Sequence, residues 1–302
     1  MPKINKHTFS SVIPGGATPA SRFGVISSFL KWAGAKTRCM DQLLNSLPSE
    51  HEVECLVEPF VGSASVFLNT CYRQYVLADN NADLIDVYRY ARDNTSLLIS
   101  HLKQLWASGH NESIYQENRK NFNTLAPGPE KSALFIWLNR HGFNGVCRYN
   151  KKGQFNVPYG RPGNCSLPEH DILNFVRKTE RCHITFFHAD FEETLKVVTE
   201  GMFSSLRCAI YCDPPYLPLN ATSGFTAYTG EKFPLQSHLQ LADMLTRIHS
   251  RTGTSVVVSA SDTSQSREIY HAFTLKELNV RRSVSASHRS RINVPEIICT
   301  LP

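Results

Sequence analysis

Short apolar runs alternate with segments of helical periodicity in two stretches of the chain. In residues 53–106 the run VECLV is followed by GSASVFLNT, which is expected to start a helix. The run YVLA is followed by a segment in which Leu84, Val87, Tyr88 and Ala91 recur at helical spacing. From 183 onward come the runs HITFF, CAIYC and SVVVS, a helical segment before SVVVS, and two late strands near 273–284 and 294–301. Strands separated by helices predict an α/β fold with a doubly wound, mostly parallel sheet covered on both faces.

A stretch of different composition separates these two parts. Residues 107–182 are rich in polar and aromatic side chains, with a helix predicted around 133–138 and then a loop rich in Gly, Asn and Pro. We interpret this stretch as a largely helical insertion in a domain made of residues 29–106 and 183–302. Residues 1–28 lack the apolar core of a signal peptide and are expected to form a flexible tail.

The composition excludes several classes of protein. Hydrophobic residues make up 41% of the 302 residues, and no apolar run approaches the roughly 18 to 20 residues of a membrane span, so we expect a soluble protein of the cytoplasm. The nine cysteines form no C-x-x-C pair and the twelve histidines no H-E-x-x-H motif, which predicts reduced thiols and no metal site. Cys208 and Cys212 bracket the run CAIYC and are expected to be buried.

The net charge of +6 is concentrated in two regions. Residues 139–163 contain no acidic residue, and their basic residues are Arg140, Arg148, Lys151, Lys152 and Arg161, interleaved with Phe and Tyr. Residues 276–291 contain one acid, Glu277, and the basic residues Lys276, Arg281, Arg282, Arg289 and Arg291. A solvated charged surface normally carries both signs, so this pattern indicates surfaces that face nucleic acid.

Acidic residues follow several of the predicted strands. Glu58 comes after VECLV, Asp79 after YVLA, Asp190 after HITFF and Asp213 after CAIYC. Ligands of open α/β sheets bind beyond the carboxyl ends of the strands, which makes these acids candidate ligand contacts. Asp79 lies 21 residues after Glu58, a spacing at which such folds hold ribose hydroxyls, although an acid that caps the next helix is as good an interpretation. Gly62 in the first turn lacks the G-x-G-x-x-G spacing of a dinucleotide site.

The motif Asp213-Pro214-Pro215-Tyr216 is the most specific of these strand ends. Pro214 and Pro215 fix the backbone and lack N–H donors, so the motif presents a rigid rim of acceptors. The Asp213 carboxylate and the Pro214 carbonyl can each accept one N–H of an exocyclic amine, while Tyr216 offers a ring for stacking. Two fixed acceptors direct the lone pair of the amine towards an electrophile. The alternative is a Pro-Pro turn that only closes a strand.

Several longer motifs carry a resemblance to a known family. The chain contains FLKWAGAK at 29–36, LVEPFVGSASVFLNT at 56–70, ADNNADLI at 78–85, LNRHGFNGVCRYNKKGQFNVPYGR at 138–161 and YCDPPY at 211–216. With these motifs the chain resembles the DNA adenine methyltransferase (Dam) family of bacteria and phages, which is N6-adenine-specific and of the GATC type. The resemblance covers nearly the whole chain after the tail. It implies a Rossmann-like fold, S-adenosylmethionine as cofactor and double-stranded DNA as partner.

The resemblance also assigns roles around the cofactor. It implies that Trp32 and Lys36 help to hold S-adenosylmethionine, with Gly62 in the binding turn, and that Asp79 binds the ribose. Two further residues, Asp190 and Phe191, match a position that contacts the adenine of the cofactor. The catalytic set lies where cofactor and target adenine meet, and consists of Asp213, Pro214, Pro215 and Tyr216.

The resemblance identifies residues 139–161 as the target-recognition hairpin of enzymes that methylate adenine in GATC. Within it Arg148 reads guanine in the major groove and Phe143 takes the place of an aromatic wedge. Lys31, from the N-terminal motif, contacts the first base pair. The other implied DNA contacts are Asn144, Val146, Asn150, Lys151, Pro158 and Arg161.

The chain departs from the family pattern at five positions. The family usually has Gly in place of Ala35 and Ala64, and an alanine with a positive φ would cost about 1 kcal/mol. It often has Tyr in place of Phe143, Leu in place of Val146 and Tyr in place of Pro162. Phe143 and Val146 lie in the recognition hairpin and Pro162 directly follows it, so a relaxed variant of GATC stays open.

We therefore expect a monomeric enzyme that uses S-adenosylmethionine to methylate adenine N6 in duplex DNA after flipping the base out of the stack. Methylation of cytosine N4 or of a protein glutamine uses related pockets, but those families usually have Ser or Asn in place of Asp213. A catalytically silent DNA-binding remnant is the alternative from another class. The presence of Trp32, Lys36, Asp79 and Asp213 together argues against a silent remnant.

Overall fold

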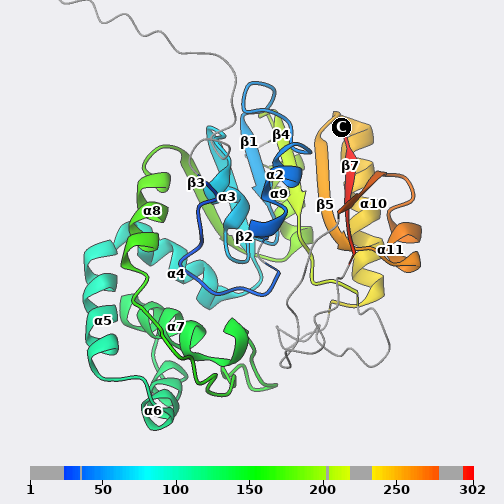
Figure 1. Cartoon of the computed structure of the whole chain (residues 1–302). Helices are drawn as coiled ribbons and strands as arrows, with labels where there is room; N and C mark the ends of the chain where they lie inside the picture. The colour runs from blue at the N-terminus through cyan, green and yellow to red at the C-terminus, as the bar shows by residue number, and fades with distance from the viewer. Residues whose placement is uncertain (1–23, 35, 202–203, 218–232, 279–294) are drawn as a thin grey trace, which may run out of the picture.

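The computed structural model describes residues 24–34, 36–201, 204–217, 233–278 and 295–302. Within these ranges a seven-stranded sheet runs through the molecule in the order β3-β2-β1-β4-β5-β7-β6 (Figure 1). Its strands in chain order are β1 Cys55–Glu58, β2 Gln74–Asp79, β3 His183–His188, β4 Cys208–Cys212, β5 Ser255–Ser261, β6 Thr274–Leu278 and β7 Glu296–Leu301.

The direction of the strands places a switch point in the middle of the sheet. The neighbours β3, β2, β1, β4 and β5 run parallel, while β7 is antiparallel to both β5 and β6. The chain moves outward from β1 to β2 and β3 and then returns to the other side of β1 to form β4. Ligands in open α/β sheets bind beside such a reversal. The α/β fold with a mostly parallel sheet, expected from the sequence, is confirmed.

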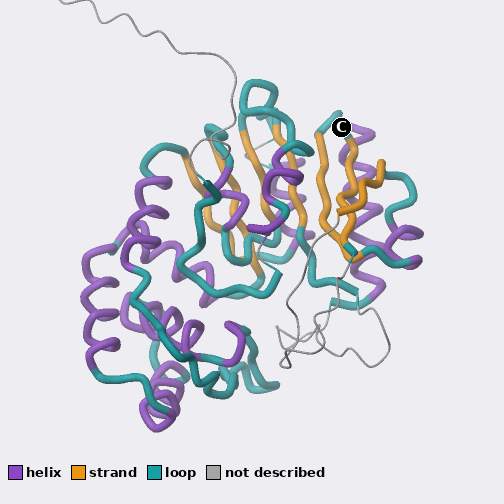
Figure 2. The backbone as a smooth tube through the Cα atoms, in the orientation of Figure 1, coloured by secondary structure: helices purple, strands orange, loops and turns teal. Residues whose placement is uncertain are grey.

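Helices cover both faces of the sheet because the strands are apolar on both sides (Figure 2). In β1, Leu56 packs in one core with α4 (Ala82–Asp93) and α8 (Glu169–Thr179). Its neighbours Cys55 and Val57 pack in a second core with α9 (Phe191–Glu200) and α10 (Leu235–Thr252). Successive side chains of a strand point to opposite faces, so one run of buried residues serves both cores. Cys208 and Cys212 are buried in the second core, as expected.

The chain between β2 and β3 adds further helices beside the sheet. After α4 come α5 Thr95–Ala107, α6 Glu112–Phe122, α7 Pro129–His141 and the single turn η2 Phe143–Gly145. Helix α7 packs against α4, α5 and α6, which leaves most of its side chains buried. The sequence predicted helix only around 133–138, because a helix that is buried on nearly all sides shows no amphipathic period. Pro129 at its first turn extends it towards the N-terminus.

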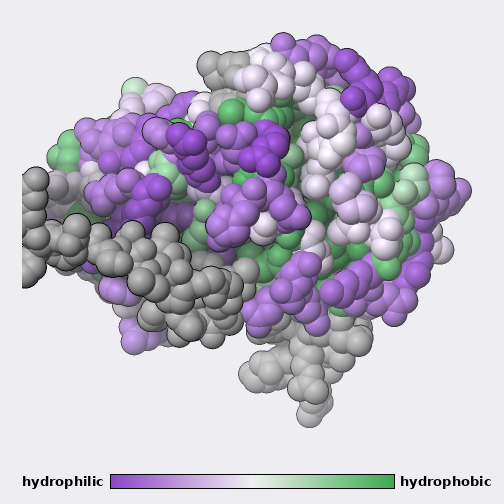
Figure 3. All heavy atoms as spheres, turned by 90° about the horizontal axis from the view of Figure 1, so that it is seen from above, coloured by the Kyte–Doolittle hydropathy of each residue, from purple (hydrophilic) through white to green (hydrophobic). Residues whose placement is uncertain are grey.

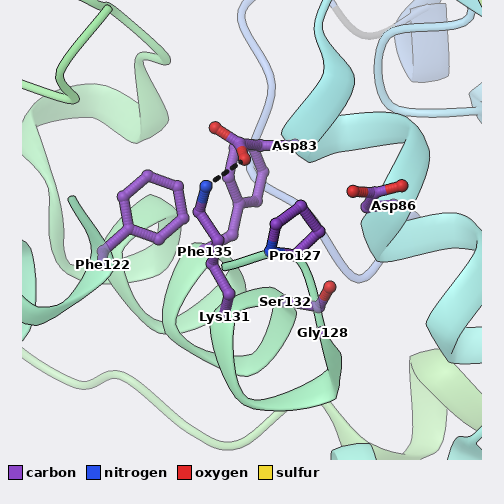
Figure 4. Close-up of a pocket in the computed structure, with 8 residues that line it drawn as sticks. All are labelled: Asp83, Asp86, Phe122, Pro127, Gly128, Lys131, Ser132 and Phe135. Carbon is purple, nitrogen blue, oxygen red and sulfur yellow. Dashed lines mark ion pairs between the residues drawn. The ribbon is translucent and has the colours of Figure 1, made fainter. Parts of the chain in front are cut away.

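An ion pair joins this helical part to the sheet domain. Lys131 Nζ of α7 lies 2.9 Å from Asp83 Oδ1 in the first turn of α4 (Figure 4). The same ammonium lies 5.0 Å from the centre of the Phe122 ring on α6. In the close-up the Asp83 carboxylate faces Lys131, whereas Asp86, one turn further along α4, points away from it. The pair is mostly buried and is therefore screened less by salt than a surface pair.

The remaining elements differ from expectation mainly at their ends. The expected helix in GSASVFLNT begins only at Ser65, as α3 (Ser65–Asn69). The sequence predicts a late strand at 273–284, and the part of it after 278 lies outside the described residues. Residues 1–23 of the expected tail also lie outside them. The Ile26 amide donates to Asn69 Oδ1 at 2.8 Å and its carbonyl accepts from Asn69 Nδ2 at 2.9 Å, so part of the segment before residue 29 is held against α3. Three short helices complete the structure, η1 Lys36–Arg38, α2 Met40–Leu44 and α11 Ser264–Ile269.

The two ends of the sheet face different surroundings. The carboxyl ends of the parallel strands point towards α6 and α7 (Figure 1). The opposite end, seen in Figure 3, is covered mainly by hydrophilic residues, with hydrophobic ones in the recesses between them. Across the described ranges, no helix is both long enough and apolar enough to cross a membrane.

Candidate active site and DNA interface

Asp213, directly after β4, lies in a network of polar side chains. Lys36 Nζ, on a side chain only 3% exposed, lies 2.7 Å from Asp213 Oδ1 and donates to the Tyr216 hydroxyl at 2.9 Å. That hydroxyl donates to Glu296 Oε2 at 3.0 Å, and the Lys36 ammonium lies 4.8 Å from the centre of the Tyr216 ring. Pro214, which follows Asp213 in the chain, is buried. The fold thus joins two carboxylates, an ammonium and an aromatic ring from three distant parts of the sequence.

Glu58 ends β1, the strand next to β4. Its side chain is 1% exposed, and its Oε1 has no hydrogen-bond partner among the described residues. Burial, and next the negative charge of Asp213, raise the pKa of Glu58 to about 8. With this pKa, Glu58 is protonated at neutral pH. Asp213, which pairs with Lys36, is then the charged one of the two acids at the ends of β1 and β4.

Asp79 ends β2 and holds the turn that follows β1. Its Oδ2 accepts from the Gly62 amide at 3.1 Å and its Oδ1 from the Asn81 amide at 3.0 Å. Tyr88 of α4 donates to the Gly62 carbonyl at 2.5 Å. Gly62 has φ +46, and a Cβ added there would lie 2.9 Å from Trp32 Nε1. The turn therefore requires glycine both for its backbone conformation and because the Trp32 indole packs directly on it.

Burial changes the acid–base behaviour of Asp79. It raises the pKa of the carboxyl to about 6, against the opposing effect of the two amides that donate to it. An acid with a shifted pKa at the carboxyl end of a strand is a candidate functional group.

Ala35 and Ala64 stand where the family usually has glycine, and the structure describes the second of them. Ala64 has φ 57 and ψ 26, so this position does lie in the left-handed region. Its methyl group is fully buried, which offsets part of the backbone strain. Ala35 lies outside the described residues.

Asp190 and Phe191 lie at the start of α9. The Asp190 side chain accepts from the Glu193 amide at 2.8 Å and therefore caps the helix. Phe191 is buried and stacks on Phe60, with ring centres 5.9 Å apart and planes at 22°. Phe233 closes this aromatic cluster, 5.6 Å from Phe191 and 5.7 Å from Phe60. Phe60 belongs to the same turn as Gly62, so the cluster adjoins the Asp79 site.

The recognition hairpin is closed by two backbone bridges, between Gly142 and Tyr159 and between Tyr149 and Phe155. Within it, Arg148 Nε donates to Asn156 Oδ1 at 2.8 Å and Nη2 to the Asn156 carbonyl at 3.0 Å. These bonds orient the guanidinium on the exposed side of the hairpin. The sequence analysis singled out Arg148 but not Asn156.

The other side chains expected to contact DNA are mostly at the surface. Phe143 is 38% exposed, and Asn144 has φ 53, a left-handed conformation that asparagine tolerates better than most residues. Val146 and Asn150 are half-buried. Lys31, Lys151, Pro158 and Arg161 are exposed, as are Asn144 and Arg148. Of the second basic region, Lys276 lies in β6, and the four arginines lie outside the described residues.

The structure thus brings the expected residues together in three groups. Gly62 lies against Trp32 and donates to Asp79, and Lys36 joins Asp213 and Tyr216. The DNA-contact candidates, apart from Lys31, lie on the hairpin, which bonds through Cys147 and Tyr149 to Asn81 and Asp83, just beyond the end of β2. Sequence reasoning missed Glu296, whose partner Tyr216 lies 80 residues away in another motif. It also missed Asn156, although Asn156 lies in the same motif as its partner Arg148, eight residues away.

Three comparisons relate the chain to known proteins. Residues 32–284 match the model of a family described as D12 class N6 adenine-specific DNA methyltransferase. The chain is 37% identical over 272 residues to the DNA adenine methylase of Haemophilus influenzae, covering 89% of this chain and 92% of that protein. It is 39% identical to the DNA adenine methylase of Salmonella typhi, covering 90% and 94%. Among solved structures, the rRNA methyltransferase aviRa from Streptomyces viridochromogenes aligns over 86% of this chain and 81% of that chain, with a TM-score of 0.34 at 12% identity.

Proposed function

This chain belongs to the D12 class N6 adenine-specific DNA methyltransferases, and on that basis we propose that it methylates adenine N6 within GATC sites of duplex DNA. The methyl donor in this proposal is S-adenosylmethionine, and the enzyme acts as a monomer in the cytoplasm. The observation that supports the proposal best is the arrangement around Asp213.

Asp213, Pro214 and Tyr216 supply what an aromatic amine needs to become a nucleophile. The Asp213 carboxylate has lone pairs beyond the one that faces Lys36, so it can accept one N–H of adenine N6 while the Pro214 carbonyl accepts the other. With both hydrogens held, the nitrogen lone pair points away from the two acceptors. Tyr216, fixed by Lys36 and Glu296, offers a ring against which the adenine stacks.

The residues around Asp79 fit S-adenosylmethionine. The Asp79 carboxylate can accept from two ribose hydroxyls, and Gly62 lets the Trp32 indole pack directly on the turn that Asp79 holds. When bound, S-adenosylmethionine supplies an activated methyl group. Adenine N6 would take up that methyl group from the sulfur of the donor, and Asp213 would accept the proton that N6 loses and pass it to solvent.

The target adenine must leave the DNA stack to reach Asp213, because the acid lies at a strand end and not on the exposed hairpin. Phe143, exposed on the hairpin, is placed to fill the space that a flipped base leaves in the duplex. Arg148 carries a planar fork that suits the O6 and N7 atoms of guanine, and Asn156 holds that fork in the free protein.

Transfer of a labelled methyl group tests the proposal. The enzyme is incubated with labelled S-adenosylmethionine and duplexes that contain GATC or a variant of it, and the methylated nucleoside is identified. N6-methyladenine, formed preferentially on GATC, is the expected product. Asp213→Ala should abolish transfer while DNA binding largely survives, because water cannot replace the fixed acceptor.

Three results would contradict the proposal. N4-methylcytosine would assign a different target base, and absence of transfer from any duplex would favour a silent DNA-binding protein. Transfer by Asp213→Ala within tenfold of wild type would remove Asp213 from the mechanism.

A further inference from the structure

The segment 145–149, which carries Val146 and Arg148, is held on one side by the residue before Trp32. The Lys31 amide donates to Asn139 Oδ1 at 2.8 Å, and Asn139 Nδ2 donates to the carbonyls of Lys31 at 2.8 Å and Gly145 at 3.1 Å. A Cβ added to Gly145 would lie 2.4 Å from Lys31 Cβ, so the two backbones are in close contact. Trp32, proposed to hold the cofactor, is thus one residue from a direct attachment to the hairpin.

The same segment is held on its other side by the first turn of α4. Asn81 Nδ2 donates to Cys147 Sγ at 3.3 Å, and the Tyr149 hydroxyl donates to Asp83 Oδ2 at 2.6 Å. The other oxygen of Asp83 faces Lys131, the pair shown in Figure 4. Cys147 and Tyr149 are the two chain neighbours of Arg148. The guanine-reading candidate is therefore attached to α4 through both flanking residues.

The first turn of α4 is joined to Asp79 through its N-cap residue, Asn81. The Asn81 amide donates to Asp79 Oδ1 at 3.0 Å, and Asn81 Oδ1 accepts from the Leu84 amide at 3.2 Å and so caps the helix. A capped helix start moves as one body, because its backbone bonds and its cap restrain the same few residues. A ligand that displaces or orders the Asp79 carboxylate therefore acts on Asn81 and Asp83 as well.

We propose that Tyr149 is a positioning residue that couples cofactor binding to guanine recognition through its hydrogen bond to Asp83. This inference rests on the proposed function, in which Asp79 binds the ribose and Arg148 reads the base. Ordering of Asp79 by the cofactor stabilises the helix start that holds Tyr149, and Tyr149 fixes the backbone from which Arg148 projects. Such coupling is reciprocal, so DNA strengthens cofactor binding by the same factor.

The effect of removing the hydroxyl can be separated from loss of folding. Tyr149→Phe keeps the ring, which packs edge to face on Phe155 at 5.9 Å, and leaves Asp83 still paired with Lys131. Tyr159→Phe is a matched control, because the Tyr159 hydroxyl bonds to the His110 carbonyl, away from α4. Lys131→Met is a second control, because it breaks the ion pair of Asp83 and keeps the Tyr149 bond.

The experiment measures the dissociation constant of S-adenosylhomocysteine by calorimetry, with free enzyme and with enzyme saturated with a GATC duplex. In wild type the duplex should lower this constant, by a factor on the order of 10. In Tyr149→Phe the factor should fall at least threefold, while the constant of the free enzyme and the melting temperature change little. In both controls the factor should stay within twofold of wild type. If Tyr149→Phe does not fold, Asp83→Ala, which removes the acceptor of the Tyr149 hydroxyl, replaces it and should change the factor in the same direction.

The possible failures are distinguishable. The coupling role would be overturned, and the proposed function would stand, if the duplex does not change the dissociation constant of S-adenosylhomocysteine for wild type. The same holds if the factor is unchanged in Tyr149→Phe, or if it falls in Lys131→Met as much as in Tyr149→Phe. A wild-type enzyme that binds neither S-adenosylhomocysteine nor the GATC duplex would overturn the proposed function, and this inference with it.

Discussion

Asp79 is a carboxyl group whose charge changes near physiological pH. Burial raises its pKa to about 6, while the Asn81 and Gly62 amides, and after them a protonated His188, favour the charged form. The hydroxyls of a ribose are donors and therefore also favour the carboxylate over the protonated acid. In the proposed function, protonation of Asp79 therefore weakens cofactor binding.

The affinity for S-adenosylhomocysteine should consequently decrease as the pH falls through about 6. Below that value the decrease should approach tenfold for each pH unit, and above it the affinity should level off, because the carboxyl is already ionised. Asp79→Asn should bind more weakly at neutral pH and lose this dependence. Calorimetric titrations at several pH values provide the test, and a wild-type affinity that is constant from about pH 5 to pH 8 would contradict it.

At the scale of elements, the turn after β1 combines a positive φ with close packing. Gly62→Ala introduces strain at φ +46 and also a contact of 2.9 Å with Trp32 Nε1. Gly153, in the recognition hairpin, has φ +72 and open space around it, so Gly153→Ala introduces the strain alone.

Gly62→Ala should therefore weaken cofactor affinity about tenfold or more, whereas Gly153→Ala should leave that affinity within about twofold of wild type. Both variants should lose about 1 kcal/mol of stability from the backbone strain. Cofactor titration and thermal unfolding of the two variants check this. An equal effect on cofactor affinity would mean that displacement of Trp32 has no part in binding.

The recognition hairpin contains two kinds of basic side chain. Arg148 is held by two hydrogen bonds to Asn156, whereas Lys151 is exposed. A fixed planar fork suits guanine, and a flexible point charge suits phosphate.

Arg148→Ala should lose about 1 to 3 kcal/mol, or 5- to 150-fold, on GATC and little on duplexes altered at the guanine. Lys151→Ala should weaken binding to all duplexes alike and reduce the slope of log affinity against log salt by about one. Binding and methylation of duplexes substituted at each of the four positions, over a range of salt concentrations, measure both effects. An equal loss on every duplex for Arg148→Ala would assign it to phosphate contact.

At the scale of the whole molecule, the switch point between β1 and β4 places a buried acid in the centre of the sheet. Glu58 has a pKa raised to about 8, so the folded protein binds its proton where the unfolded chain, at an ordinary value of 4.5, has lost it. The free energy of unfolding should therefore fall as the pH rises from about 4.5 to about 8, and stay low above that.

Glu58→Gln removes the proton equilibrium and keeps the shape of the side chain. The variant should be more stable than wild type at about pH 9, by a difference on the order of 3 kcal/mol, and should match it near pH 5. Denaturant unfolding at the two pH values measures the difference. If the free energy of unfolding falls equally in both proteins between about pH 5 and about pH 9, the titrating group is not Glu58.

Much of the architecture could be predicted because its signals are local. Each apolar run, such as CAIYC before Asp213, gives a strand by itself, and the order of strands and helices predicts the parallel sheet. Helices of the 107–182 stretch were harder to predict. Residues outside 133–138 in α7 lack an amphipathic period because neighbouring helices cover most of its surface.

The sequence by itself determined the fold class, the family and the chemical types of the candidate residues, because motifs and apolar periodicity are properties of neighbouring positions. It could not determine which distant side chains meet. Tyr216 reaches Glu296 across 80 residues, and Tyr149 reaches Asp83 across 66, through contacts that depend on strand order and helix packing. The conformation of Ala64 and the proton on Glu58 likewise depend on tertiary structure, since φ is set by the turn around the alanine and burial by the strands on either side of the glutamate.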